Sequence, residues 1–558
     1  MSVLESLREQ NFLERLRDRD ASPWSDEPEA QAVISSRLGW LDVHRQMLDR
    51  LDELRDFAEW VRENEFRWAV LLGMGGSSLA PEVLQRTFGS RNGCPELIVL
   101  DTTDPESILR VENRINIVST LFIVSSKSGT TIETASLHRY FAERTQDATG
   151  DTGVLTNFVA VTDPGTVLHR QAEEEDFHHV FLNPPDIGGR YSALSMFGLA
   201  PAAAIGMDVR RLLEAAETLD WEEALELGAR LGELAQDGRD KITFLAAEGL
   251  ESFGAWAEQL LAESTGKRGR GVIPVDCEPA GPLEVYGDDR VFVYLDAAEG
   301  NDELDSGVQA LEAAGHPVIT TTTDDAYALG REFLRWEIAT AVLGAVLRIN
   351  PFDEPNVQES KDNTRQVLEE YARAGDRDLP RSDPAASDDG LALYMDGTTG
   401  AMLRDSGDGS VPGLVAALVG RAQPTQYVAI MAYIRRSEEH DRLLTELRKA
   451  VRDATRTATT VGYGPRFLHS TGQLHKGGPP TGIFLQITCE DDVDIDIPGS
   501  KLGFSVLKQS QAQGDMQALQ SRKRPVVSVH LEDDVTGNLR DLVKAVAAGL
   551  ALRTAAVE

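Results

Sequence analysis

The sequence has few cysteines and no long apolar run. Only three cysteines occur in 558 residues, Cys94, Cys277 and Cys489, and they lie far apart. Because neither a disulfide framework nor the paired spacing of a zinc site can be drawn from them, the sequence predicts no disulfide-rich fold and no metal site. No stretch approaches the roughly 18 consecutive apolar residues of a membrane-spanning helix, and the first ten residues show a charged amphipathic pattern rather than a signal peptide. We therefore expect a cytoplasmic protein.

Basic residues are also scarce. Lys and Arg number 55 against 91 Asp and Glu, which gives a formal net charge of −36. This excess argues against nucleic acid and against an anionic membrane surface as partners. A binding site for an anion would have to be locally basic, and the candidates for that role are Lys127, Arg190, Lys267 and Lys361. An apolar content of 41% and a mean hydropathy of −0.26 are ordinary for a globular protein of several domains.

Strand and helix patterns alternate along most of the chain. The helical spacing of apolar residues predicts a helical N-terminal segment over residues 1–65. Apolar strand patterns separated by helix patterns then predict parallel, doubly wound α/β domains over residues 66–218 and 219–375. Residues 376–412 are rich in Asp, Gly, Ser and Pro, which predicts an irregular linker. A third α/β unit is expected over residues 413–558.

The third unit repeats the order of strands and helices that is predicted for the second. Even the strand openings Pro-Val-Ile-Thr at 317–320 and Pro-Val-Val-Ser at 525–528 occupy matching places. We interpret this as a duplication; the alternative is that α/β units in general share such an outline. The predicted fold class is α/β, with tandem doubly wound parallel-sheet domains behind a helical N-terminal segment.

Two strand-to-helix turns in the first domain are rich in glycine and hydroxyl side chains. Residues 73–79 read Gly-Met-Gly-Gly-Ser-Ser-Leu, and residues 125–134 read Ser-Ser-Lys-Ser-Gly-Thr-Thr-Ile-Glu-Thr. Free N–H groups at a helix start bind anions, and parallel sheets bind ligands beyond the carboxyl ends of their strands. Because neither turn has the spacing of a nucleotide-binding loop, the expected anion is a phosphate monoester. The alternative is that both are ordinary strand–helix turns.

These two motifs resemble the phosphate-binding motifs of the glucose-6-phosphate isomerase family, which is built from SIS (sugar isomerase) domains. The resemblance runs from about residue 30 to 375 and is closest to the isomerase half of bacterial chains in which this enzyme is fused to transaldolase. It implies an aldose–ketose isomerase that interconverts glucose 6-phosphate and fructose 6-phosphate through an enediolate, without a metal or cofactor. The expected phosphate-binding residues are Ser77, Ser126, Lys127, Ser128 and Thr131, and the other expected substrate-binding residues are Gly75, Gly189 and Gln259.

Three further segments carry charged residues suited to this chemistry. Glu263 lies four residues after Gln259, near the end of a predicted helix, where the helix dipole should raise the pKa of a carboxylate toward neutrality. Arg190 follows a Gly-Gly pair, and Lys361 lies in the first turn of a predicted helix. Taken alone, each would be interpreted as a surface residue. Their segments resemble family motifs, which implies that Glu263 transfers the proton, Arg190 stabilises the enediolate and Lys361 assists ring opening.

The histidine that opens the sugar ring in the family is missing from its expected place in the second domain, because residues 277–286 contain none. A similar segment, Leu-His-Ser-Thr-Gly-Gln at 468–473, instead lies in the third unit and contains His469. In the family this histidine comes from the neighbouring subunit of a dimer. We therefore expect the third unit to replace that subunit, so that a monomer can be active. The alternative is a chance histidine in a glycine-rich loop.

A second class of function would need only the phosphate turns. A non-catalytic SIS protein binds a sugar phosphate and regulates a partner, without acid–base residues. The presence of Glu263, Arg190 and Lys361 in family-like segments argues against this class. An isomerase of another hexose phosphate stays open as an alternative, and a small sugar phosphate is the expected ligand in each case.

Overall fold

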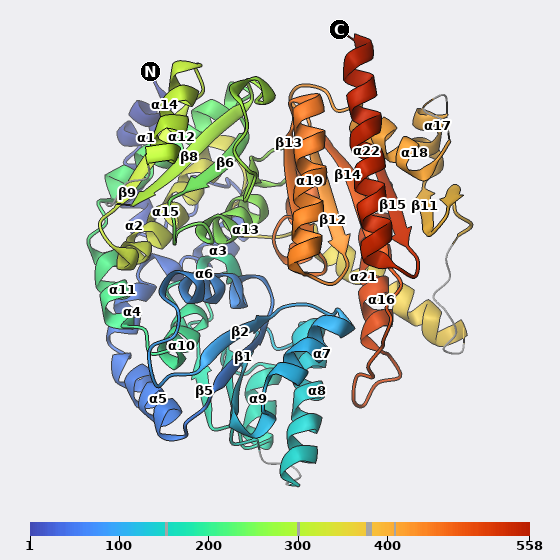
Figure 1. Ribbon diagram of the computed structural model, residues 1–558. Coiled ribbons are helices and arrows are strands. Elements are labelled where there is room, and N and C mark those ends of the chain that lie inside the picture. The colour runs from blue at the N-terminus through green and yellow to red at the C-terminus, as the bar shows by residue number, and fades with distance from the viewer. Residues whose placement is uncertain (151–154, 298–301, 375–381, 405, 407–408, 558) are drawn as a thin grey trace.

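A helical segment and three α/β units make up the chain. The computed structural model describes residues 1–557 apart from 151–154, 298–301, 375–381, 405 and 407–408. In Figure 1 the first unit lies below the second on the left, and the third lies to their right. No helix in these residues is long and apolar enough to cross a membrane. The predicted helical N-terminal segment is confirmed: α1 (Val3–Glu9), α2 (Phe12–Arg17), α3 (Pro28–Ser35), α4 (Val43–Leu48) and α5 (Leu51–Glu63).

The first unit is a parallel sheet of five strands in the order β2-β1-β3-β4-β5. Its strands are β1 (Trp68–Gly73), β2 (Glu96–Leu100), β3 (Thr120–Ser125), β4 (Phe158–Thr162) and β5 (His179–Leu182). The central strands are buried on both faces, which explains their nearly continuous apolar sequences. Since β1 pairs with β3 and Gly73 lies opposite Ser125, the two hydroxyl-rich turns leave the same edge of the sheet.

The second unit is a parallel sheet of four strands in the order β7-β6-β8-β9. The strands are β6 (Lys241–Ala246), β7 (Ile273–Val275), β8 (Arg290–Ala297) and β9 (Val318–Thr323). Helix α13 (Phe253–Thr265) joins the first two strands, and α15 (Leu329–Leu347) follows the last. The next helix, α16 (Val357–Ala374), packs along α21 (Phe504–Ser521) of the third unit. Elements of the second unit therefore reach the third.

The third unit shares the strand order of the second. Its strands β12 (Tyr427–Tyr433), β13 (Ala458–Tyr463), β14 (Gly482–Cys489) and β15 (Val526–Leu531) are parallel and lie in the order β13-β12-β14-β15. Numbered within each unit, both sheets run second, first, third, fourth. The helices also correspond, with α19 (Glu438–Thr455), α21 and α22 (Val535–Val557) in place of α13, α14 (Asp302–Ala313) and α15. This common topology supports the proposed duplication.

The prediction of an irregular linker over residues 376–412 is wrong for most of that stretch. Strands β10 (Ala386–Asp388) and β11 (Leu391–Met395) form a hairpin, and β11 pairs antiparallel with β15. Helices α17 (Gly397–Leu403) and α18 (Val411–Val419) follow and pack on the same unit. The third unit therefore begins by residue 386 rather than 413, and residues 376–381, 405 and 407–408 of the predicted linker lie outside the described part.

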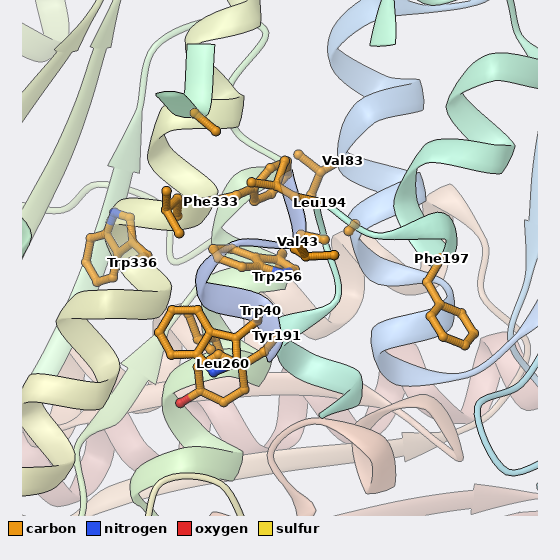
Figure 2. Close-up of a cluster of buried hydrophobic side chains, with 14 of the residues drawn as sticks. Trp40, Val43, Val83, Tyr191, Leu194, Phe197, Trp256, Leu260, Phe333 and Trp336 are labelled. Atoms are coloured by element: carbon orange, nitrogen blue, oxygen red, sulfur yellow. The ribbon is translucent and has the colours of Figure 1, made fainter. Parts of the chain in front are cut away.

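One apolar core joins the N-terminal segment to the first and second units. Trp40 stacks on Tyr191 with 5.0 Å between ring centroids, and Trp256 meets Phe333 edge to face at 4.7 Å. Figure 2 shows these rings packed together with Leu260 of α13. Removal of such a fully buried aromatic side chain costs roughly 3–5 kcal/mol. This core holds α13 and the turn that contains Tyr191 against each other, and both carry residues of the candidate site.

Candidate active site

The second hydroxyl-rich turn surrounds the start of α8 (Ile132–Thr149). Ser126 Oγ accepts the Gly129 N–H at 3.1 Å and donates to Thr131 Oγ1 at 3.3 Å. Ser128 and Thr130 pair through their hydroxyls at 2.9 Å. Thr131 is the N-cap residue but its side chain caps no N–H group of the helix. The turn thus combines free helix N–H groups with four hydroxyls, an arrangement that suits a phosphate.

Lys127 does not take part in this arrangement. Its ammonium forms an ion pair with the Asp163 carboxylate and donates to the Pro185 carbonyl oxygen at 3.0 Å. Asp163 directly follows β4, which pairs with β3, so the sheet places the carboxylate beside Lys127. The charge of Lys127 is compensated there, and the prediction that it grips the phosphate is wrong for this conformation.

The first turn is a close crossing of backbones. A Cβ atom on Gly76 would overlap the carbonyl oxygen of Gly189. A Cβ atom on Gly75, whose φ is +56°, would lie 2.8 Å from Gln259 Nε2 and 2.9 Å from the His469 carbonyl oxygen. Only glycine fits such contacts. The turn at Ser77 therefore brings parts of all three units to one point.

Arg190 is buried, with 3% of its surface exposed, in the short 3₁₀ helix Gly189–Tyr191. Its Nη1 lies 3.1 Å from Glu354 Oε2 and 3.7 Å from Glu263 Oε2. The remaining donors bind Ser264 Oγ at 2.8 Å, the Pro351 carbonyl oxygen at 2.7 Å and the Asp353 carbonyl oxygen at 2.9 Å. These bonds fix the guanidinium between two carboxylates, so it offers a rigid positive charge beside Glu263.

Glu263 lies near the end of α13, and its side chain is 12% exposed. Burial raises the pKa of this carboxylate above its usual value; Arg190 opposes the rise, and Glu354 adds to it. Sequence reasoning attributed a raised pKa to the helix dipole, whereas burial is the largest cause here. A raised pKa suits a carboxylate that takes up and releases a proton during catalysis.

His469 reaches this point from the third unit. Its carbonyl oxygen accepts from Gln259 Nε2 at 2.7 Å, and the same amide lies 3.2 Å from Glu263 Oε2. Its ring Nε2 lies 2.8 Å from Glu133 Oε1, which also accepts from Gln511 Nε2 at 2.7 Å. The imidazole is thus held by a buried carboxylate, and Gln259 links the His469 backbone to Glu263 within a single chain.

Sequence reasoning missed the partners of His469. Burial alone would raise the pKa of Glu133, but His469, and more weakly Lys361, hold it below the usual value, so the carboxylate stays ionised. Glu133 lies within the second hydroxyl-rich motif, and this position was the one sign in the sequence that it could belong to the site. Gln511 lies on α21 in a run of glutamines, and nothing in the sequence distinguishes it from its neighbours.

A cavity of about 300 Å³ opens beside His469. Its walls include Thr130 and Thr131 of the phosphate turn, Lys361 of α16, and His469. Glu263 and Arg190 are not among its lining residues; Glu263 adjoins it through Gln259 and His469, and Arg190 lies beside Glu263. The structure therefore brings together every predicted catalytic residue, while Lys127 points to Asp163 instead.

Comparisons with known proteins agree on one family. Residues 31–226 match the family model described as phosphoglucose isomerase. The glucose-6-phosphate isomerase of Rubrobacter xylanophilus is 31% identical over 407 residues, a match that covers 92% of that protein and 62% of this chain. A solved structure of a hypothetical protein from Thermus thermophilus is 27% identical with a TM-score of 0.55, and the match covers 65% of this chain and 96% of that one. The structure of a glucose-6-phosphate isomerase from Chlamydia trachomatis, 19% identical with a TM-score of 0.54, shares the fold over 66% of this chain and 86% of its own.

Proposed function

Because the chain belongs to the phosphoglucose isomerase family, we propose that the residues around Glu263 form the site at which it interconverts glucose 6-phosphate and fructose 6-phosphate. The observation that carries this proposal is the meeting of Glu263, Arg190 and His469 beside the phosphate turn. A regulator that only binds sugar phosphates would need none of these three residues. Purified protein should convert fructose 6-phosphate to glucose 6-phosphate in a coupled assay, and a protein that binds the sugar phosphate without converting it would refute the assignment.

Ring opening begins the proposed mechanism. The phosphate binds at Ser77, Ser126, Ser128 and Thr131, which leaves the sugar ring facing His469 and Lys361. His469 moves the proton between the C1 hydroxyl and the ring oxygen, and Lys361 assists from the cavity wall. Glu133 holds the imidazole in position, as paired carboxylates do for catalytic histidines.

Proton transfer follows on the open chain. Glu263 takes the C2 proton of the aldose. The electron pair of the C2–H bond forms a double bond between C1 and C2, which gives an enediolate with its negative charge on the C1 oxygen. Arg190 stabilises that oxygen with a charge already fixed in place, so little reorganisation is needed. The proton of the C2 hydroxyl passes to the C1 oxygen, and the protonated Glu263 returns its proton to C1, which forms the C2 carbonyl of the ketose.

We further propose that the third unit takes the place of a partner subunit. It shares the strand order of the second unit, and it supplies His469 to a site whose other catalytic residues come from the first two. Nearly the whole length of the relatives corresponds to about two thirds of this chain, which agrees with an added unit. The proposed division is 1–65, 66–218 and 219–374 for the first three parts, and 386–558 for the third unit. One chain would then carry one complete site and could be active as a monomer.

Loss of the phosphate hydroxyls should weaken binding and leave the fold intact. Ser126→Ala and Thr131→Ala each remove a hydroxyl beside the α8 N-terminus, so each should weaken substrate binding by roughly 1–3 kcal/mol. Titration calorimetry with a non-reacting sugar phosphate measures this directly. Equal affinity of the double variant and the unaltered protein would place the phosphate elsewhere.

Glu354→Gln should shift the pH profile toward acid. The charge of Glu354 raises the pKa of Glu263, so its removal lowers that pKa and keeps the base ionised at lower pH. The acidic limb of kcat/KM should therefore move to lower pH, and kcat should fall because the base is weaker. Asp353→Asn is the matched control, since the Asp353 carboxylate pairs with Lys267 rather than with Arg190. An unmoved acidic limb, or an equal shift in the control, would contradict this electrostatic coupling.

A further inference from the structure

An open cleft of about 670 Å³ lies between the second and third units, and Lys267 forms part of its wall. Its walls come from residues 267–269, 349, 350, 353, 355, 356, 476–478, 480, 522 and 524. Among the described residues that line it, five are basic and one, Asp353, is acidic; the basic ones are Lys267, Arg268, Lys476, Arg522 and Arg524. The chain as a whole has 91 acidic and 55 basic residues, so the cleft reverses the overall balance of charge.

Three of the five cations already have a carboxylate partner. Lys267 Nζ lies 2.8 Å from Asp353 Oδ1, Lys476 Nζ lies 2.7 Å from Asp515 Oδ1, and Arg522 Nε lies 2.9 Å from Glu359 Oε2. In the part of the chain that the structure describes, Arg268 and Arg524 have none. The cleft therefore carries two positive charges that no carboxylate among the described residues balances.

Arg524 is the clearer case of an unbalanced positive charge, because only 7% of its surface is exposed. Its guanidinium donates to three carbonyl oxygens, those of Lys476, Gly478 and Pro479, at 2.7–3.2 Å, and its buried Nε has no partner within the described ranges. Burial lowers the pKa of Arg524; Tyr427 opposes this effect, and repulsion by Arg522 adds to it. A buried charge without a counter-charge is unfavourable, and an anion in the cleft would relieve it.

A purely structural role explains only part of the positive charge in the cleft. Arg524 binds carbonyl groups at the end of α20 (Gly472–Gly477), where a positive charge is favourable. That role accounts for Arg524 alone. It does not account for Arg268 and Arg522, which are exposed and turned to the same cleft.

We propose that this cleft is a regulatory site for a small polyanion that carries two or more phosphate or carboxylate groups. Several basic side chains around one opening suit such a ligand, because Arg and Lys bind both kinds of group. This site lies apart from the phosphate turn, and its ligand need not be the substrate.

The loop at residues 350–354 connects the cleft to the candidate active site. Lys267, in the cleft wall, donates to the carbonyl oxygens of Asn350 and Asp353. Arg190 donates to the carbonyl oxygens of Pro351 and Asp353. An anion that draws Lys267 toward the cleft changes the bonds of this loop and therefore the position of Arg190. Occupancy should alter kcat, because Arg190 acts on the enediolate rather than on the phosphate.

The test is titration calorimetry of the full chain with pyrophosphate and with citrate, which represent the two kinds of group. The variant Arg268→Gln/Arg522→Gln should bind the preferred anion about tenfold more weakly or worse, since it removes two charged contacts. Lys523→Gln, which removes an exposed charge between Arg522 and Arg524 but outside the cleft, should bind normally. Arg268→Gln alone is a second variant, because no carboxylate partner is lost with it. Ser126→Ala/Thr131→Ala should keep this binding.

The outcomes separate cleanly. The site is supported if either anion binds, if the cleft variants weaken that binding and if Ser126→Ala/Thr131→Ala leaves it unchanged. The anion that binds more tightly then identifies the ligand class. A saturating concentration of the anion should change the kcat of the unaltered protein and leave the kcat of the cleft variants unchanged. The proposal is overturned if neither anion binds, if binding disappears with the turn variant alone, or if Lys523→Gln weakens it as much as the cleft variants do. Failure here leaves the isomerase assignment untouched, because that rests on the assay of turnover.

Discussion

Glu263→Gln is expected to lower kcat at least about 10²-fold with little change in KM. Glutamine keeps the shape of the side chain and its hydrogen bonds, but it cannot accept the C2 proton. The raised pKa of Glu263 comes mainly from burial, so the replaced group is one that the fold prepares for proton transfer. Steady-state kinetics in both directions, together with exchange of the C2 hydrogen with solvent, measures the loss.

Glu258→Gln provides the matched control for that variant. Glu258 lies in the same helix, α13, and burial raises its pKa to about 8, so an amide replaces a mostly neutral carboxyl group at pH 7. It makes none of the contacts of the candidate site, and its variant should turn over almost normally. Near-normal kcat for Glu263→Gln, or an equal loss in Glu258→Gln, would remove Glu263 from the mechanism.

His469→Ala should separate ring opening from proton transfer. Turnover of the cyclic sugar should fall about 10²-fold, the usual effect of losing a general acid–base group. Exchange of the C2 proton in an open-chain analogue should change far less, because that reaction needs no ring opening. Glu133→Gln should give a smaller loss of the same selective kind, since it leaves the imidazole present but less firmly held.

The comparison of the two substrates serves as the internal control for these variants. A variant that merely disturbs the fold would slow both reactions equally. Undiminished turnover of the cyclic sugar by His469→Ala would contradict the role assigned to His469, and the third unit would then act as a cover or an oligomerisation surface.

Much of this architecture could be predicted from the sequence because the signals are local. Buried parallel strands such as β1 and β3 appear as short apolar runs, and a glycine-rich turn after each one marks the edge where ligands bind. The repeated order of elements also led us to expect His469 at the site of Glu263, and in the structure Gln259 links the two residues. The common strand order of the second and third sheets agrees with it.

The errors came from contacts between distant segments. Composition indicated a linker over residues 376–412, but β11 finds its partner in β15, more than 130 residues away, and no local pattern reports such a pairing. Lys127 lies in a phosphate motif, yet a neighbouring strand supplies Asp163 as its partner. The bond between His469 and Glu133 joins residues 336 positions apart, so it became visible only in the folded chain.

The central claim is that one chain carries one complete active site, with His469 supplied from within. Mixing purified Glu263→Gln and His469→Ala proteins tests it most directly, after incubation under conditions that allow subunits to exchange. If His469 acts within its own chain, every chain in the mixture lacks one essential group, and activity should stay at the sum of the two separate variants. Recovery of activity well above that sum would mean that His469 of one chain completes the site of another, and it would contradict the account.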